Sequence, residues 1–248
     1  MKKNILLATI FIAILQIAQS QIINTFPLDD SVGIGTTTPV ALFHVASDRI
    51  QLGARNFNGT GGFAIGQYTL QSNTTGSSNT AVGDESMRYN TTGSYNTTLG
   101  MSALESNISG TSNTAIGLDC MLLNVGGSYN TAVGFGANHQ AGIGNRNTAI
   151  GSEALYDCFK GSYNTSIGDN NMRNTGKGNN NTSVGALAMT NNTQGSNNTI
   201  VGYDAETSSG NLNNASAFGS GALVDASNKV RIGNASVSSN GGQVSWTA

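Results

Sequence analysis

Residues 79–83 read Asn-Thr-Ala-Val-Gly, residues 96–100 read Asn-Thr-Thr-Leu-Gly, and residues 113–117 read Asn-Thr-Ala-Ile-Gly. The glycine of this pentad recurs every 17 residues, with no insertion or deletion, at ten positions: Gly66, Gly83, Gly100, Gly117, Gly134, Gly151, Gly168, Gly185, Gly202 and Gly219. A period of this length is typical of repeat proteins in which each unit forms one coil of a stack.

Each coil is expected to contain two short strands. The first is the pentad itself, in which threonine and the apolar residue before the glycine should share the core face, because side chains alternate across a strand. The second should carry an apolar column four residues after the glycine, and further glycines (Gly76 to Gly195) should close the turns. This second column consists of Leu70, Met87, Leu104, Met121, Leu155, Met172, Met189 and Leu223. The predicted fold class is therefore all-β, a parallel β-roll or β-solenoid of about ten 17-residue coils.

Two other structures are less compatible with the repeat. Seventeen residues at 3.6 per turn leave no constant helical face, and paired glycines disfavour helix interiors. Disorder fits the Asn, Gly, Ser and Thr content, but disordered chains usually carry a high net charge. Here only 10% of residues are charged, the net charge is −2, and a strict register would have no purpose.

Asparagine stands four residues before the repeat glycine in eight of the ten coils. Stacked coils would place these side chains one above another, so we expect a ladder of amide hydrogen bonds. The core is thin, with about two large apolar side chains per coil, each contributing ~1.5–3 kcal/mol on burial. That scarcely offsets the ordering entropy of a coil, so we expect several copies to pack side by side.

The rest of the chain divides around the repeat. Residues 1–20 have Lys2 and Lys3, an apolar run and small residues at a cleavage site, which predicts a signal peptide and a secreted or cell-surface protein exported as in Gram-negative bacteria. Residues 21–58 are expected to be transitional, with a turn leading into a strand near Val45. Residues 59–227 hold the repeat, and residues 228–248 a cap or the start of a downstream segment.

The recurrent Asn-Thr-Ala-Val/Ile-Gly followed by Ala-Leu resembles the head repeats of trimeric autotransporter adhesins. That resemblance implies a left-handed parallel β-roll packed as a homotrimer around an axis. The Val-Gly-Ile-Gly-Thr-Thr-Thr-Pro stretch at 32–39 and the Asn-Lys-Val-Arg-Ile-Gly stretch at 228–233 are similar to secreted fibre-like proteins of Bacteroidetes and to phage tail fibres. In that group the second stretch often precedes a self-cleaving intramolecular chaperone domain.

The sequence indicates no catalytic constellation, cofactor or metal site. His44 and His139 are the only histidines, neither recurs in the repeat, and no acidic column repeats as a calcium-binding roll requires. Cys120 and Cys158 lie in different columns two or more coils apart, about 10 Å along the stack, so we expect no intrachain disulfide. Cys120 occupies a small-residue column and should be a buried thiol.

One surface column is a candidate ligand site. Five residues before the repeat glycine, Tyr95, Tyr129 and Tyr163 appear in every second coil, with Arg146 between the last two. Successive coils are ~4.8 Å apart, which is close enough for cation–π contact. Such an aromatic ridge could hold sugars or a partner surface, although a turn column that merely tolerates aromatic residues would look the same.

These observations favour a non-enzymatic extracellular fibre with a structural or surface-binding role. Its partners would be two further copies of the chain and a host surface or glycan, with no nucleic acid and no membrane span after signal cleavage. One alternative is a receptor-binding segment of phage tail-fibre type. Another is an ice- or crystal-binding solenoid, which the threonine column suggests but which requires those threonines to face outward on a flat surface. A carbohydrate-active enzyme would need clustered carboxylates, and none recur.

Overall fold

A computed structural model describes residues 32–34, 43–45 and 62–236. The chain forms two compact units, residues 1–53 and 54–248. In the first unit, β1 (Val32–Ile34) and β2 (Phe43–Val45) pair in parallel, with Gly33 opposite His44. The expected strand near Val45 is therefore present, whereas the predicted signal peptide lies outside the described residues.

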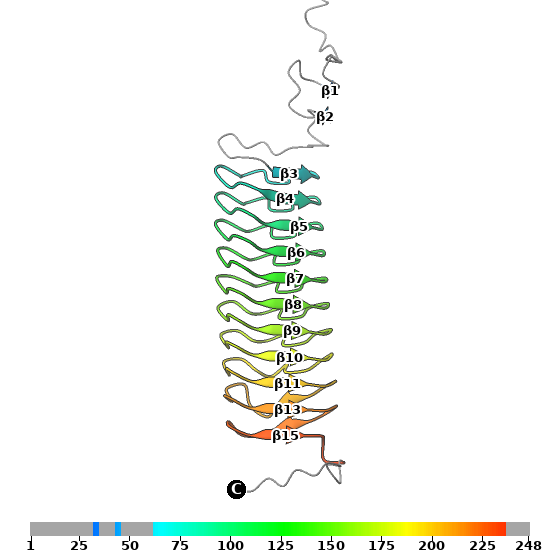
Figure 1. The fold of residues 1–248 in the computed structure, drawn as a ribbon, viewed down its shortest axis with the longest axis vertical. Coiled ribbons are helices and arrows are strands. Elements are labelled where there is room, and N and C mark those ends of the chain that lie inside the picture. The colour runs from blue at the N-terminus through cyan, green and yellow to red at the C-terminus, as the bar shows by residue number, and fades with distance from the viewer. Residues whose placement is uncertain (1–31, 35–42, 46–61, 237–248) are drawn as a thin grey trace, which may run out of the picture. The chain divides into compact units, whose positions relative to one another are not determined.

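The second unit is a stack of parallel strands, one per coil (Figure 1). Through β13, every residue pairs with the residue 17 positions on, and β15 then follows β13 at a spacing of 14. The strands of this 11-stranded sheet are β3 (Gly62–Ile65), β4 (Asn79–Val82), β5 (Thr97–Leu99), β6 (Thr114–Ile116), β7 (Thr131–Val133), β8 (Thr148–Ile150), β9 (Thr165–Ile167), β10 (Thr182–Val184), β11 (Thr199–Val201), β13 (Ser216–Phe218) and β15 (Val230–Ile232). The predicted β-solenoid of about ten coils is confirmed.

The wall opposite the sheet is built from turns, so the prediction of a second strand in every coil was wrong. We call this segment, from the repeat glycine to the next strand, the turn wall. Residues two and four positions after the glycine adopt positive φ, for example Asp119 at 56° and Met121 at 52°. Left-handed residues interrupt an extended chain, so only β12 (Glu206–Thr207) and β14 (Leu223–Val224) form strands there.

The core face of the sheet is also the reverse of the expectation. The small residue of the pentad points inward, and Ala81, Ala115 and Ala132 are fully buried. Threonine and the apolar residue flank it and point outward, as the burial pattern of β8 shows. The reason is that the Leu and Met column of the turn wall, fully buried at Met121 and Leu155, fills most of the interior. The side chain opposite is therefore small in most coils, although Ile200 of β11 is also fully buried there.

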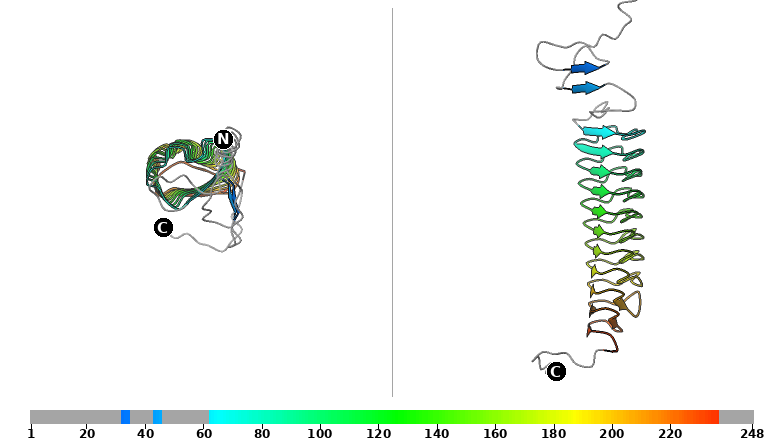
Figure 2. Two further views of the ribbon diagram at one scale, coloured as in Figure 1. Left: turned by 90° about the horizontal axis from the view of Figure 1, so that it is seen from above. Right: turned by 90° about the vertical axis from the view of Figure 1, so that its right-hand side faces the viewer.

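Gly134 illustrates why the repeat glycine is required. Its φ is 136°, a value that L side chains rarely adopt. A Cβ there would also collide with the carbonyl oxygen of Gly151 in the next coil. The second glycine that most coils contain, such as Gly127, has ordinary φ but the same close approach to the next coil. The close stacking of the coils depends on these contacts, and the right-hand view of Figure 2 shows the coils stacked from the side.

The expected asparagine ladder is present and is buried inside the stack. The Asn113 Oδ1 accepts the backbone N–H of Asn130 at 2.9 Å, and its Nδ2 donates to the carbonyl of Gly127 at 2.8 Å. The same pair of bonds recurs from Asn79 to Asn198. Each amide therefore ties its own coil closed and holds the next coil in register.

A second asparagine ladder runs along the turn wall and is incomplete. The Asn90 Nδ2 donates to Asn73 Oδ1 at 2.7 Å, and Asn107 and Asn124 continue the row. The next coil has Ala141 in this column, and Asn124 Oδ1 is left buried without a hydrogen-bond partner. The middle of the stack is therefore less completely hydrogen-bonded than its beginning.

Candidate functional site

The tyrosine ridge, by which we mean Tyr95, Tyr129, Arg146 and Tyr163, lies on the surface just before the strands. Each tyrosine precedes a buried ladder asparagine, which fixes its position, and each has a φ of 60°. The backbone N–H of each donates to a carbonyl of the preceding coil, as from Tyr129 to Thr111 at 2.9 Å. The exposed fraction falls from 65% at Tyr95 to 57% at Tyr129 and 52% at Tyr163.

Arg146 occupies the space between two of these rings. Its guanidinium carbon lies 5.3 Å from the centroid of Tyr129 and 5.4 Å from that of Tyr163. Its Nη1 also donates to the Tyr163 hydroxyl at 2.6 Å. The predicted cation–π stack is therefore present, and it explains why these two tyrosines are less exposed than Tyr95.

A second group of stacked side chains lies on the turn wall and was missed from the sequence. The rings of His139 and Tyr156 stack with their centroids 4.6 Å apart. The guanidinium carbon of Arg173 lies 5.0 Å from the centroid of the Tyr156 ring. Arg173 also forms an ion pair with Glu153 at 2.8 Å. These three planar residues are spaced by 17, which is the signal that could have revealed them.

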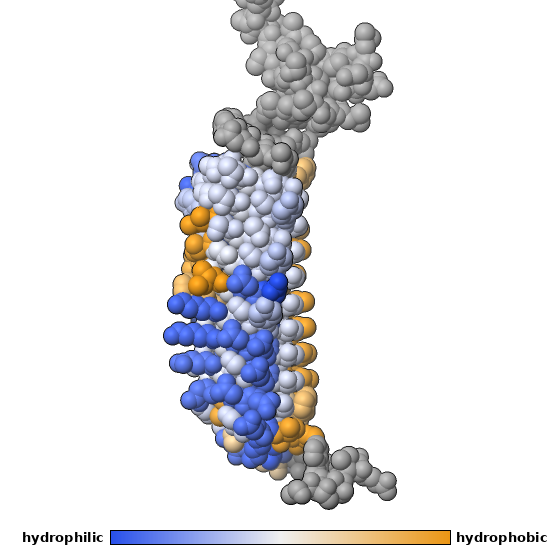
Figure 3. Space-filling model, turned by 60° about the vertical axis from the view of Figure 1, so that its left-hand side comes forward, coloured by the Kyte–Doolittle hydropathy of each residue, from blue (hydrophilic) through white to orange (hydrophobic). Residues whose placement is uncertain are grey.

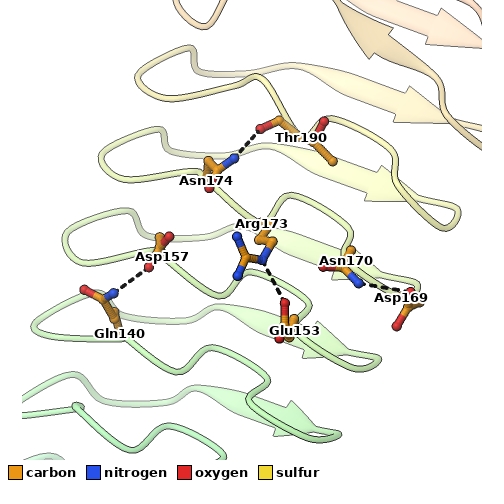
Figure 4. A network of polar contacts seen from close by, with 8 residues as sticks. All are labelled: Gln140, Glu153, Asp157, Asp169, Asn170, Arg173, Asn174 and Thr190. Atoms are coloured by element: carbon orange, nitrogen blue, oxygen red, sulfur yellow. Dashed lines mark hydrogen bonds and ion pairs between the residues drawn. The ribbon is translucent and has the colours of Figure 1, made fainter.

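Figure 4 shows the polar contacts around Arg173, with its ion pair to Glu153. The Gln140 Nε2 donates to Asp157 Oδ1 between adjacent coils, and the Asn174 amide donates to the Thr190 carbonyl. Burial lowers the pKa of His139 below its ordinary value of 6.5, although nearby carboxylates act in the opposite direction. His139 is therefore expected to be neutral at pH 7, and both faces of the Tyr156 ring are already covered by protein.

The third surface feature is the sheet face, the outward side of the 11-stranded sheet with its threonine and apolar columns. Leu99 is 52% exposed and Ile150 is 41% exposed, and further apolar residues continue the column. In Figure 3, hydrophobic atoms recur coil by coil along the right-hand edge of the stack. The threonine beside each apolar residue is exposed or half-buried, from Thr80 to Thr199.

Both cysteines are free and buried. Cys120 lies in the small-residue column as expected, and burial raises the pKa of Cys120 and of Cys158 from 9.0 to about 12. Across the described residues, no three His, Cys, Asp or Glu side chains are grouped to hold a metal ion. The same part of the chain has no helix with the length and hydropathy of a membrane span.

His44 lies in β2, where only its backbone is described.

The chain matches no family model, and no curated protein or solved structure is significantly similar to it.

Proposed function

We propose that this protein is a non-enzymatic extracellular fibre segment in which three copies pack through their sheet faces. The observation that carries the proposal is the uncovered apolar column of the sheet. Ten pentads present an outward Ile, Val, Leu or Phe, and several of these are more than a third exposed. A long, regular apolar surface of this kind usually marks an interface.

The thin core supports the same proposal. Inside one copy, each coil buries about one Leu or Met and several small residues, so the apolar burial per ordered residue is low. Covering the half-exposed aliphatic column would add burial in every coil at ~25 cal/mol per Å². Packing around a three-fold axis is the arrangement that the resemblance to adhesin heads implies, and the leader-like residues 1–20 support the proposal of secretion.

The test is the solution mass of the chain from residue 21, measured by light scattering. A trimer is expected. The variant Leu99→Lys, Val133→Lys and Ile167→Lys places charges in alternate coils of the sheet face and should be monomeric. A matched variant, Ile108→Lys, Leu123→Lys and Ile143→Lys, alters exposed aliphatic residues of the turn wall and should remain trimeric. A wild-type chain that is a folded monomer would refute the proposal.

A second candidate, ice or crystal-surface binding, is favoured by one observation. The threonine column faces outward, contrary to the sequence-based expectation, and stands on a regular sheet with a repeat of ~4.8 Å. This function requires the sheet face to be free, so it competes directly with trimer formation. Thermal hysteresis by a monomeric chain, abolished in Thr114→Tyr and Thr148→Tyr, would support it, and a trimer without hysteresis would dismiss it.

A further inference from the structure

The tyrosine ridge contains two slots of the same construction, and only one of them is filled. The filled slot is Tyr129, Arg146 and Tyr163, where a guanidinium lies over both rings at 5.3 and 5.4 Å. The other slot is Tyr95, Ser112 and Tyr129. A serine side chain ends at its hydroxyl and cannot extend between two tyrosine rings, so this slot holds no side chain of its own coil.

The backbone makes the two slots equivalent. Tyr95, Ser112 and Tyr129 have φ values of 60°, 57° and 60°, while Arg146 has 56°. The N–H of Ser112 donates to the carbonyl one coil earlier, as that of Arg146 does, both at 3.0 Å. Two coil steps separate the tyrosines of each slot by about 9.5 Å. A planar group at the middle level would therefore lie about 5 Å from each ring, within the range of cation–π contact.

We propose that the slot formed by Tyr95, Ser112 and Tyr129 binds a planar cation, namely an arginine guanidinium presented by a partner polypeptide. The chain itself shows the fit, because Arg146 makes this interaction one slot further along. A bound guanidinium could also donate to a tyrosine hydroxyl, as Arg146 does to Tyr163 at 2.6 Å.

Nearby charge allows this ligand. The bound cation and Arg146 would be two coil steps apart with the Tyr129 ring between them, and at that distance physiological salt screens much of their repulsion. The inference goes beyond the proposed trimeric fibre and rests on it only for its extracellular setting. The slot itself can be tested in solution whatever the oligomeric state.

The experiment is a titration of the chain from residue 21, followed by NMR of the tyrosine ring protons. The probe is N-acetyl-arginine amide, and its matched control is N-acetyl-citrulline amide, which has the same shape without the charge. We expect the arginine probe to shift the rings of Tyr95 and Tyr129 and to bind about tenfold more tightly than the citrulline probe, which corresponds to about 1.4 kcal/mol.

Three variants locate the binding. Ser112→Arg should fill the slot from within, as Arg146 fills its own, and Tyr95→Ser should remove one ring, so both should lose binding. Tyr163→Ser alters the neighbouring slot only and should retain it. Equal binding of the two probes, or retained binding in Ser112→Arg, would overturn the proposal. Light scattering on the same samples tests the trimer separately, so either idea can fail alone.

Discussion

Asn130→Ala is predicted to destabilise the stack severely, because one side chain satisfies two buried backbone groups. The Asn130 Oδ1 accepts the N–H of Asn147 at 2.9 Å, and its Nδ2 donates to the carbonyl of Gly144 at 2.9 Å. Alanine would leave both backbone groups without these partners inside the stack. Each buried group left unpaired costs about 1–3 kcal/mol, so the expected loss is about 2–6 kcal/mol.

The assay is urea unfolding of the chain from residue 21, followed by far-UV circular dichroism. The matched control is Asn191→Ala, because Asn191 is an exposed asparagine of the turn wall whose only hydrogen bond, from its backbone N–H to Glu206, does not involve the side chain. That variant should stay within about 0.5 kcal/mol of wild type. If Asn130→Ala costs no more free energy of unfolding than Asn191→Ala, the asparagine ladder is not a source of stability.

Three further perturbations follow from the interior of the stack. Asn138 stands where other coils have Leu or Met in the buried column, and both polar atoms of its side chain lack hydrogen-bond partners. Asn138→Leu should therefore raise the free energy of unfolding by about 1–3 kcal/mol, and a lower free energy of unfolding in this variant would contradict the prediction. Gly134→Ala should cost more than ~2 kcal/mol in the same urea assay because of its φ and the next coil, and a neutral result would refute the close approach. From pH 9 to 12 the unfolded thiols ionise while buried Cys120 and Cys158 stay protonated, so stability should fall as pH rises, by up to ~1.4 kcal/mol per unit per cysteine. Replacing both cysteines by alanine should flatten that slope, and an unchanged slope would show that the thiols do not cause it.

The period of 17 was sufficient to predict the stack, its parallel register and the asparagine ladder, although not that the ladder is buried. Spacing alone decides which residues lie above one another, and Asn113 and Asn130 meet for that reason. Which face of the sheet points toward the core could not be predicted in the same way. Ile116 and Met121 each belong to an apolar column, so either column could fill the core. The alternation of side chains says only that Ile116 and Ala115 face opposite sides of the sheet, not which side is the core.

The second strand was predicted wrongly because φ is not visible in residue type here. Met121 and Leu155 are residue types common in helices and strands, yet both adopt φ above 50° at the turn-wall position four residues after the repeat glycine. Coil-to-coil hydrogen bonds and burial impose that conformation against local preference. These constraints come from neighbouring coils and are not encoded in the residues of a single pentad.

The candidate site was also predicted only in part. The stack of Tyr129, Arg146 and Tyr163 could be predicted because it depends on register alone. The stack of His139 and Tyr156 depends on register too, but His139 does not recur in the repeat, so only a comparison with the residue 17 positions away reveals it. Comparing adjacent coils column by column would have found it.

The ladder bonds join each coil to the next along the stacking direction, which has a mechanical consequence. If the ends of the stack are pulled apart, all coil interfaces carry the same force in series. Among the described residues, the coil at each end is bonded to one neighbouring coil only. Force applied where the chain leaves an end coil would break the hydrogen bonds between that coil and the next one after another, as in peeling, rather than all together. Each released coil of 17 residues would lengthen the chain by on the order of 50 Å. A single copy should thus be an extensible tether that yields in equal steps, and a bundle of copies would be a stiffer one.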